Sequence, residues 1–305
     1  MNNTLSRRKF LALSGAVVAA GNLSIPGRKS FASGVKSRIS ISDGADDQTL
    51  INALATFGGI EKFVTENSVV VLKPNISFPN PPEWGTTTSP WLVKSVTELC
   101  LEAGAKKVII ADNPLGTSPE NNLKRSGIGE SVAGMDKVNV MMLSEQRKYL
   151  AKSLPSEQLK TVETARILEK ADVLINLPTA KAHTETGVSL GLKNLMGLIW
   201  DRKVFHQKYN LELAIAELAL YLRPQLTIMD VSRALLNNGP MGPGRVEKVN
   251  KIVAGIDPVA VDSITLNLAN FNLRKMNYHQ VPHIEYAEKI GIGNANPDNI
   301  EVNVV

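Results

Sequence analysis

The chain has a single cysteine, Cys100, among its 305 residues. One thiol cannot form an intramolecular disulfide, and it cannot supply the several thiolates of a structural zinc site or an iron–sulfur cluster. Cys100 also falls on the apolar, helically spaced face of residues 92–103, which predicts a buried core thiol. The sequence therefore excludes disulfide scaffolds and cysteine-ligated metal centres within one chain.

The chain also lacks an apolar run long enough for a permanent membrane span. The short apolar stretch 11–20 follows Arg7, Arg8 and Lys9, and a small-x-Ala cleavage pattern ends at Ala32. This order of features predicts a twin-arginine signal peptide over residues 1–32, recognised by the twin-arginine export machinery, and a periplasmic or otherwise exported protein. The alternative is a disordered basic tail before an amphipathic helix.

An excess of positive charge is missing from the remainder of the chain. Residues 1–32 hold five of the 34 basic residues and no acidic one, so residues 33–305 carry 29 basic and 29 acidic side chains and a formal net charge of zero. A nucleic-acid-binding protein needs surplus Lys and Arg to displace phosphate counterions. Nucleic acid is therefore excluded as an expected partner.

Apolar, β-branched runs alternate with helical patterns through residues 33–305, which we expect to form a single domain. Strands are predicted at residues 69–72, 108–111, 138–142, 173–177, 226–229 and 251–254. Helices are predicted from Pro90 to Gly104, over 161–170, over 211–222 and from Pro258 onward. This alternation predicts an α/β fold, with a mainly parallel sheet and helices on both faces.

Polar residues follow the ends of five predicted strands. They are Lys73 and Asn75, Asp112, His183, Asp230, and Asp257. Because the carboxyl ends of parallel strands meet at one edge of a sheet, we expect these groups to converge on one cleft. For each Asp or Asn taken alone, the alternative is a turn or a helix cap.

Several motifs occur in order between about residues 67 and 304. They are Lys73-Pro74-Asn75, LEAGAKKV at 101–108, GLKNLMG at 191–197, DPVAVD at 257–262 and PHI at 282–284. In these stretches the chain resembles the bacterial and archaeal family called domain of unknown function 362. Many relatives carry iron–sulfur cysteines or a ferredoxin-like module. This sequence lacks both, so the resemblance implies no iron–sulfur electron transfer here.

The candidate catalytic residues are Lys73, His183 and His206. Pro74 holds the chain extended after Lys73, which suits anion binding or, if the ammonium is desolvated, base or Schiff-base chemistry. The two histidines would transfer protons near neutral pH or bind a metal. The alternatives are a solvated surface lysine and two structural histidines.

The candidate ligand-binding residues are Asn75, Lys193, Asn194 and Arg245. Residues 187–194 depart from the nucleotide-loop pattern, because only three residues separate Gly187 from Gly191 and Asn rather than Ser or Thr follows Lys193. We expect instead a helix whose glycines permit close packing and whose amino end faces an anionic group, close packing alone being the alternative. Arg245 ends a Gly- and Pro-rich loop and would clamp a carboxylate or phosphate.

The candidate metal ligands are His183, His206, Asp230 and Asp262. Two histidines with carboxylates favour a divalent transition metal, and the sequence specifies no other cofactor. Glu185 is a third ligand or a helix-start acid, and His279 and His283 are expected to be peripheral. The leading hypothesis is an enzyme acting on a small anionic molecule, with or without a metal. The alternatives are a non-catalytic binding or delivery protein for a metal or anionic cofactor, and an interaction protein with a vestigial site.

Overall fold

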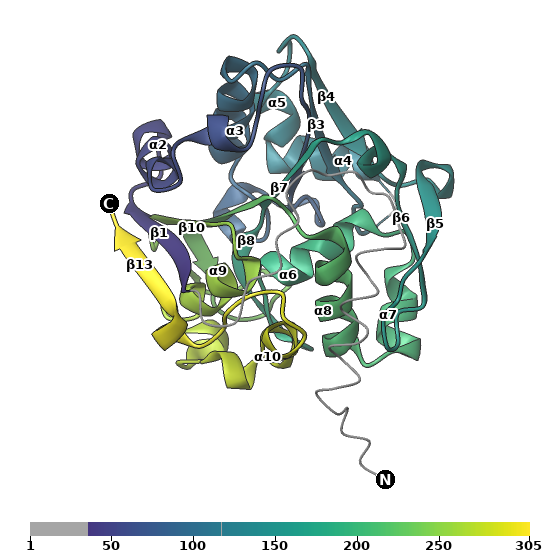
Figure 1. The fold of residues 1–305 in the computed structure, drawn as a ribbon, viewed down its shortest axis with the longest axis vertical. Helices are drawn as coiled ribbons and strands as arrows, with labels where there is room; N and C mark the ends of the chain where they lie inside the picture. Colours follow the sequence, from purple (N-terminus) through teal and green to yellow (C-terminus); the bar gives the residue numbers. More distant parts are fainter. Residues whose placement is uncertain (1–35, 117) are drawn as a thin grey trace.

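The computed structural model describes residues 36–116 and 118–305, so the predicted signal peptide lies outside the described residues. A large sheet occupies the centre, with the strand order β13-β1-β12-β10-β7-β2-β3-β4 (Figure 1). The strands of this path are β1 (Ser37–Asp43), β2 (Val69–Pro74), β3 (Lys107–Asp112), β4 (Val138–Met142), β7 (Val173–Leu177), β10 (Leu226–Leu235), β12 (Lys251–Gly255) and β13 (Ile300–Val304).

Strands β10, β7, β2, β3 and β4 pair in parallel, and β13 is parallel to β1. Only β12 is reversed along this path, being antiparallel to both β1 and β10. The central strands are continuous apolar runs because both of their faces are covered. The short strands β8 (Thr179–His183), β9 (Gly187–Ser189) and β11 (Val246–Glu247) attach to the sheet beside β10.

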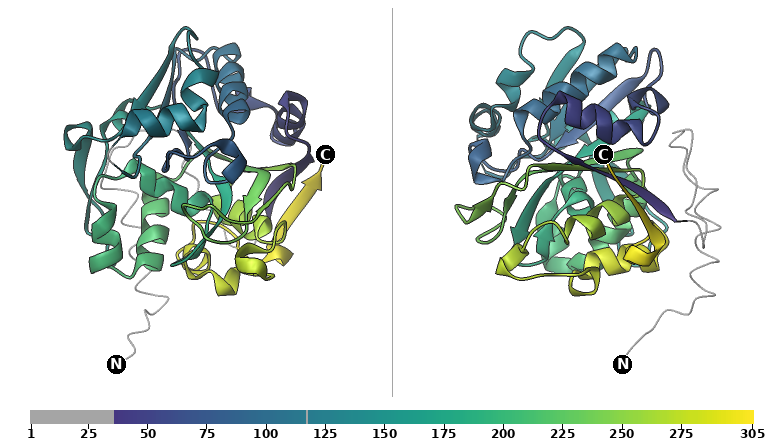
Figure 2. Two further views of the ribbon diagram at one scale, coloured as in Figure 1. Left: turned by 180° about the vertical axis from the view of Figure 1, so that it is seen from behind. Right: turned by 90° about the vertical axis from the view of Figure 1, so that its left-hand side faces the viewer.

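Helices pack on both faces, which confirms the predicted architecture (Figures 1 and 2). One face is covered by α2 (Asp47–Ala55), α3 (Pro90–Glu102) and α5 (Ile128–Ser131), whose apolar residues share a core with β2 and β3. The other is covered by α6 (Gly191–Asn194), α8 (Leu211–Leu222), α9 (Pro258–Thr265) and α10 (Pro282–Lys289). The remaining α-helices of the described residues are α4 (Pro119–Ser126) and α7 (Arg202–Lys208). No described helix has the length and apolar character to cross a membrane.

The six predicted strands are all present, and three of the four predicted helices form as α3, α8 and α9. The helix predicted over 161–170 is wrong. Residues Thr161–Ala165 form β6, which pairs with β5 (Tyr149–Ser153) in a separate two-stranded sheet, and a 3₁₀ helix covers Arg166–Lys170. The β-branched Val162 and Thr164 turn inward on alternate positions, a period of two that fits a strand better than a helix.

The reversal of β12 corrects a second expectation. Since β12 runs against its neighbours, Asp257 lies at the sheet edge opposite to Lys73, beside Ser37 at the start of β1. Asp257 caps α9, accepting hydrogen bonds from the backbone N–H of Val259 (2.8 Å) and Ala260 (3.1 Å). It therefore takes no part in a site at the carboxyl edge.

Candidate functional site

A buried ion pair lies where β2 and β3 end. Lys73 is 1% exposed, and its Nζ is 2.9 Å from Oδ1 of the fully buried Asp112. Asp112 also accepts a hydrogen bond from the backbone N–H of Ile76 (2.6 Å), which holds the loop after β2 against β3. Burial lowers the pKa of Lys73, while the Asp112 carboxylate opposes this shift.

Amide side chains connect this pair to helix α6. Asn194 Oδ1 accepts hydrogen bonds from Lys73 Nζ (3.3 Å) and Asn75 Nδ2 (3.1 Å), and Asn194 Nδ2 donates to Asn176 Oδ1 (2.8 Å). All of these side chains are buried. The structure thus brings three predicted site residues together: Lys73, Asn75 and Asn194.

Gly197 lets the segment after α6 approach this network. A Cβ at this position would overlap Asp112 Oδ1 and lie 2.6 Å from Lys73 Nζ. The close packing inferred for the glycines of residues 191–197 is therefore present, and its tightest point lies against the Lys73–Asp112 pair.

Lys181 is a buried cation that was not among the residues selected from sequence. It is 1% exposed on β8, and its Nζ donates to Asn75 Oδ1 (3.1 Å) and to the backbone oxygen of Thr86 (2.7 Å). Burial lowers its pKa to about 7; Asp112 opposes this shift, while Lys73 and Lys193 add to it. The signal was the alternation of Thr179-Ala-Lys-Ala-His183, which places Lys181 and His183 on one face of a strand.

Lys193 is 7% exposed on α6, and the partner of its Nζ is the sulfur of Met196 at 3.7 Å. Burial lowers its pKa to about 8, and the more distant carboxylates of Glu212 and Glu185 oppose the shift. The three residues Lys73, Lys181 and Lys193 are called the lysine cluster below. The charges of Lys73 and Lys193 both help to lower the pKa of Lys181.

His183, at the end of β8, is held in one tautomer. Its Nδ1 accepts hydrogen bonds from the backbone N–H groups of Glu185 (3.1 Å) and Thr186 (3.3 Å), so the ring proton lies on Nε2. Burial, Lys193 and Lys181 lower its pKa to about 2. His183 is thus a neutral hydrogen-bond donor near neutral pH, which does not suit the proton-accepting role considered from sequence.

His206 lies on α7 at the protein surface. Its Nδ1 is 2.7 Å from Oε2 of Glu185, and both side chains are exposed. Because the backbone of Glu185 contacts His183, the two histidines are neighbours across this residue. The His206 side chain is nevertheless 35% exposed, whereas His183 is 8% exposed.

Asp262 is a helix cap of an unexpected kind. Its two carboxylate oxygens accept hydrogen bonds from the backbone N–H groups of Gly191 (2.7 Å) and Leu192 (2.9 Å), so α9 caps the amino end of α6. Burial raises its pKa to about 7, against the effect of these two N–H groups. The amino end of α6, expected to face a ligand, is therefore occupied by Asp262.

Asp230 and Arg245 make no hydrogen bond or ion pair with the lysine cluster among the described residues. Asp230 is 2% exposed and accepts hydrogen bonds from the backbone N–H of Ser89 (2.7 Å) and from the hydroxyl of Ser232 (2.6 Å), which fixes the start of α3 against β10. Arg245 is exposed in the loop after β10, where its backbone pairs with Asn237 and Leu236.

The four predicted metal ligands do not form a metal site in the described part of the chain. No group of three or more His, Cys, Asp or Glu side chains there is arranged to hold a metal ion. The physical reason is that Asp230 and Asp262 use their oxygens on backbone N–H groups, while His206 pairs with Glu185 at the protein surface.

His283, expected to be peripheral, is fully buried at the start of α10. Its Nδ1 is 2.6 Å from Oε2 of Glu212 on α8, and the same oxygen accepts the backbone N–H of His283 at 3.0 Å. Burial lowers its pKa, and Lys193 contributes in the same direction. Lys193 therefore lies within electrostatic range of both His183 and His283.

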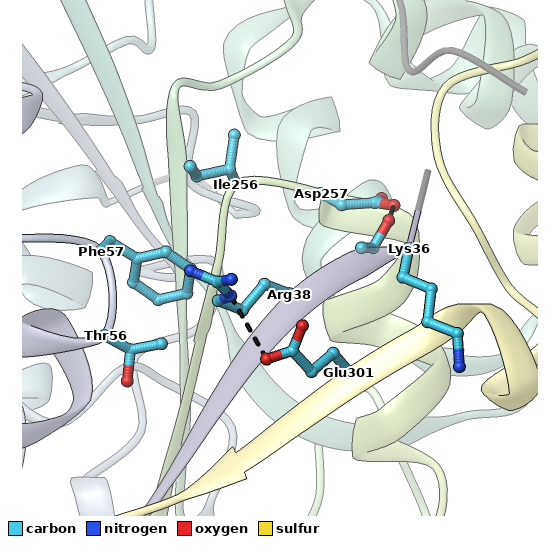
Figure 3. Close-up of a pocket in the computed structure, with 8 residues that line it drawn as sticks. Lys36, Arg38, Thr56, Phe57, Ile256, Asp257 and Glu301 are labelled. Carbon is cyan, nitrogen blue, oxygen red and sulfur yellow. Dashed lines mark hydrogen bonds and ion pairs between the residues drawn. The ribbon is translucent and has the colours of Figure 1, made fainter. Parts of the chain in front are cut away.

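A hollow of about 320 Å³ opens at the opposite edge of the sheet (Figure 3). It is lined by Phe57, Ile256 and Asp257 and by an ion pair of 3.6 Å between Arg38 and Glu301. Asp257 caps α9 and Glu301 pairs with Arg38, so neither carboxylate of the hollow is free to bind a ligand. The lysine cluster is therefore the stronger candidate for a functional site.

Comparison with known proteins gives three similarities. Residues 70–267 match the family described as Domain of unknown function (DUF362). The chain is 27% identical over 253 residues to Thylakoid-associated protein sll1697 of Synechocystis sp., a match that covers 80% of this chain and 74% of that protein. A crystal structure of a Thermotoga maritima protein is similar at a TM-score of 0.43 and 13% identity, over 81% of this chain and 60% of that one.

Proposed function

Because the chain belongs to the DUF362 family, we propose its function from the chemistry of its own site: it binds a small anionic molecule at the lysine cluster and acts on it by proton transfer. The ligand would carry a carboxylate or phosphate group. Lys193 and the Nε2–H of His183 are the expected contacts with that group.

The observation that supports anion binding is the imbalance of buried charge. Lys73 is paired with Asp112, but Lys181 and Lys193 form no ion pair with a carboxylate among the described residues. A buried ammonium without a counter-charge is costly, and an anionic ligand offsets that cost. Lys193 is the more exposed of the two and is the expected point of contact.

The observation that supports proton transfer is the pKa of the same two lysines. Burial brings the pKa of Lys181 to about 7 and that of Lys193 to about 8, near the pH at which an acid–base group is most effective. This assigns proton transfer to lysine and leaves His183 as a neutral donor. Lys73, held by Asp112, positions the network.

Isothermal titration with malate, succinate, inorganic phosphate and glycerol phosphate tests the binding step. We expect at least one anion to bind the wild-type protein, and Lys193→Met to weaken it by about tenfold or more, the scale of a charge-assisted hydrogen bond. Lys208→Met, a change at an exposed lysine of α7, is the matched control and should bind normally. Equal loss in both variants would show only a general effect of charge.

The catalytic step is tested by NMR in deuterated water with each anion that binds. Proton transfer predicts exchange of a ligand C–H or conversion of the ligand, with a loss of about 100-fold or more in Lys193→Met or Lys181→Met. Stoichiometric binding with neither exchange nor conversion would favour the non-catalytic binding or delivery protein instead.

We also propose that the protein is exported by the twin-arginine route, on the basis of Arg7, Arg8 and the apolar stretch that follows. Cell fractionation should find the processed wild-type protein outside the cytoplasm, and an Arg7→Lys, Arg8→Lys double variant inside it. Equal export of both forms would exclude this route.

A further inference from the structure

His283 presents a hydrogen-bond acceptor that the rest of the described protein leaves unused. Its ring is fully buried, and Nε2 has no hydrogen-bond partner among the described residues. The other ring nitrogen, Nδ1, is 2.6 Å from Oε2 of Glu212. Because a carboxylate only accepts hydrogen bonds, Nδ1 carries the ring proton and Nε2 keeps its lone pair.

The position of Glu212 makes this tautomer specific. One oxygen, Oε2, accepts both the ring N–H and the backbone N–H of His283, so helix α8 fixes the ring at the first turn of α10. A buried acceptor without a partner is costly, and natural proteins satisfy most such atoms. An unsatisfied nitrogen on a ring held this firmly indicates a place for an external donor.

The surroundings of His283 are those of the proposed anion site. Helix α8, which holds His283 through Glu212, also packs against α6, the helix that carries Lys193. The charge of Lys193 helps to lower the pKa of both His283 and His183. Lys193 and His183 Nε2–H are donors, whereas His283 Nε2 is an acceptor. A simple anion such as succinate would satisfy the donors and leave the acceptor unpaired.

We propose that His283 is a specificity-determining residue that accepts a hydrogen bond from the ligand through Nε2, and that the ligand is a small anion carrying a hydroxyl group near its charged group. This inference rests on the proposed anion site at Lys193. Glu212 is the positioning residue, since it acts on the ligand through the His283 tautomer.

Ring nitrogen NMR of the ¹⁵N-labelled wild-type protein tests the geometry without any substitution. The chain has only four histidines, so each ring can be assigned. In the free protein we expect the proton of His283 on Nδ1 and that of His183 on Nε2. Malate, which has a hydroxyl, should shift the His283 Nε2 resonance, whereas succinate, which lacks one, should not. A protonated Nε2 in the free protein, or no shift with bound malate, would overturn the proposal.

The variant His283→Asn tests the energetics. An Asn amide can still donate to Glu212 in place of Nδ1, but it has no atom at the position of Nε2. We expect the wild-type protein to bind malate about tenfold more tightly than succinate, which is the contribution of one hydrogen bond. In the variant this preference should disappear, while the affinity for succinate stays unchanged. His279→Asn, at an exposed histidine of the same region, is the control and should keep the preference.

The outcomes separate the two proposals. If Lys193→Met weakens binding of both anions but His283→Asn leaves the malate preference intact, the anion site stands and the role of His283 is wrong. If the wild-type protein binds no anion of the panel, both proposals fail. If His283→Asn does not fold, the NMR experiment on the wild-type protein alone decides.

Discussion

Lys73, Lys181 and Lys193 are all buried, but each ammonium is compensated differently. Lys73 has a carboxylate, Lys181 has two neutral oxygens, and Lys193 has a thioether sulfur. Lys73 and Lys193 were candidates from sequence because of their flanking motifs. Sequence does not show which of the three lysines has a counter-charge, because the partners of the Lys73 and Lys181 ammonium groups come from distant parts of the chain.

Removing the carboxylate partner of Lys73 is expected to destabilise the fold strongly. Asp112→Asn leaves a buried ammonium without its counter-charge, and the free energy of unfolding should fall by about 3–5 kcal/mol. Asp43→Asn is the matched control, because it removes the carboxylate of an exposed Lys–Asp pair with Lys251 and should cost about 1 kcal/mol or less. Denaturant unfolding of both variants measures the difference, and similar losses would contradict this account of the pair.

Lys181 predicts a dependence of stability on pH. Its pKa is lowered in the folded protein from the ordinary value of 10.5 to about 7, so between these values the unfolded chain binds one more proton than the folded one. The contribution of Lys181 to stability therefore rises with pH across this window, by about 1.4 kcal/mol per pH unit. Unfolding of the wild-type protein and Lys181→Met at pH 6.5, 8 and 9 should show the wild type gaining on the variant. Parallel pH profiles would show that Lys181 titrates normally.

At the scale of elements, α6 is a single short turn that depends on its neighbours. Asp262 of α9 caps its amino end, Asn194 ties it to β2 and β7, and Gly197 allows the following segment to pack on the Lys73–Asp112 pair. Such a short helix has little stability of its own, so these contacts hold Lys193 in place.

Asp262→Asn is expected to loosen this element. An amide has one accepting oxygen where the carboxylate has two, so either Gly191 or Leu192 loses its acceptor, at a cost of about 1–3 kcal/mol. Anion binding through Lys193 should weaken as well. Asp46→Asn at the start of α2 is the control, because Asn caps a helix about as well as Asp. The measurements are unfolding and titration, and an unchanged Asp262→Asn protein would refute the role of this cap.

At the scale of the whole molecule, the balance of charge differs between residues 33–305 and the full chain. Residues 33–305 have 29 basic and 29 acidic side chains, whereas the full chain has a net charge of +5. The positive charge of the lysine cluster is therefore local, because residues 33–305 taken together are neutral.

This balance predicts the absence of salt-dependent binding to DNA by a protein that consists of residues 33–305. Without a surplus of cations there is little counterion release, so lowering the salt concentration should not produce binding in a gel-shift assay. The full chain, with its five additional basic residues, is the comparison and should bind more strongly at low salt. Binding by residues 33–305 that strengthens steeply as the salt concentration falls would reveal a basic surface.

Sequence alone determined the α/β architecture, because local patterns carry it. The apolar run Val69–Leu72 predicts a strand, and the periodicity of Leu211–Leu222 predicts a helix, from the residues of each segment alone. The helix predicted over 161–170 is wrong because pairing with β5, together with the alternate burial of Val162 and Thr164, selects a strand for Thr161–Ala165. The direction of β12 was equally hidden, since a strand's own residues do not specify its neighbours.

Tertiary structure alone decided how the polar residues are used. Asp230 and Asp262 are carboxylates and could ligate a metal, but their oxygens accept hydrogen bonds from backbone N–H groups that lie nearby only in the folded protein. Lys181 and His283 gained their significance in the same way, through burial and through partners contributed by other elements. The burial of a polar side chain and the position of its hydrogen-bond partners depend on contacts between residues far apart in the chain. These contacts determine which of the charged side chains belong to the candidate site.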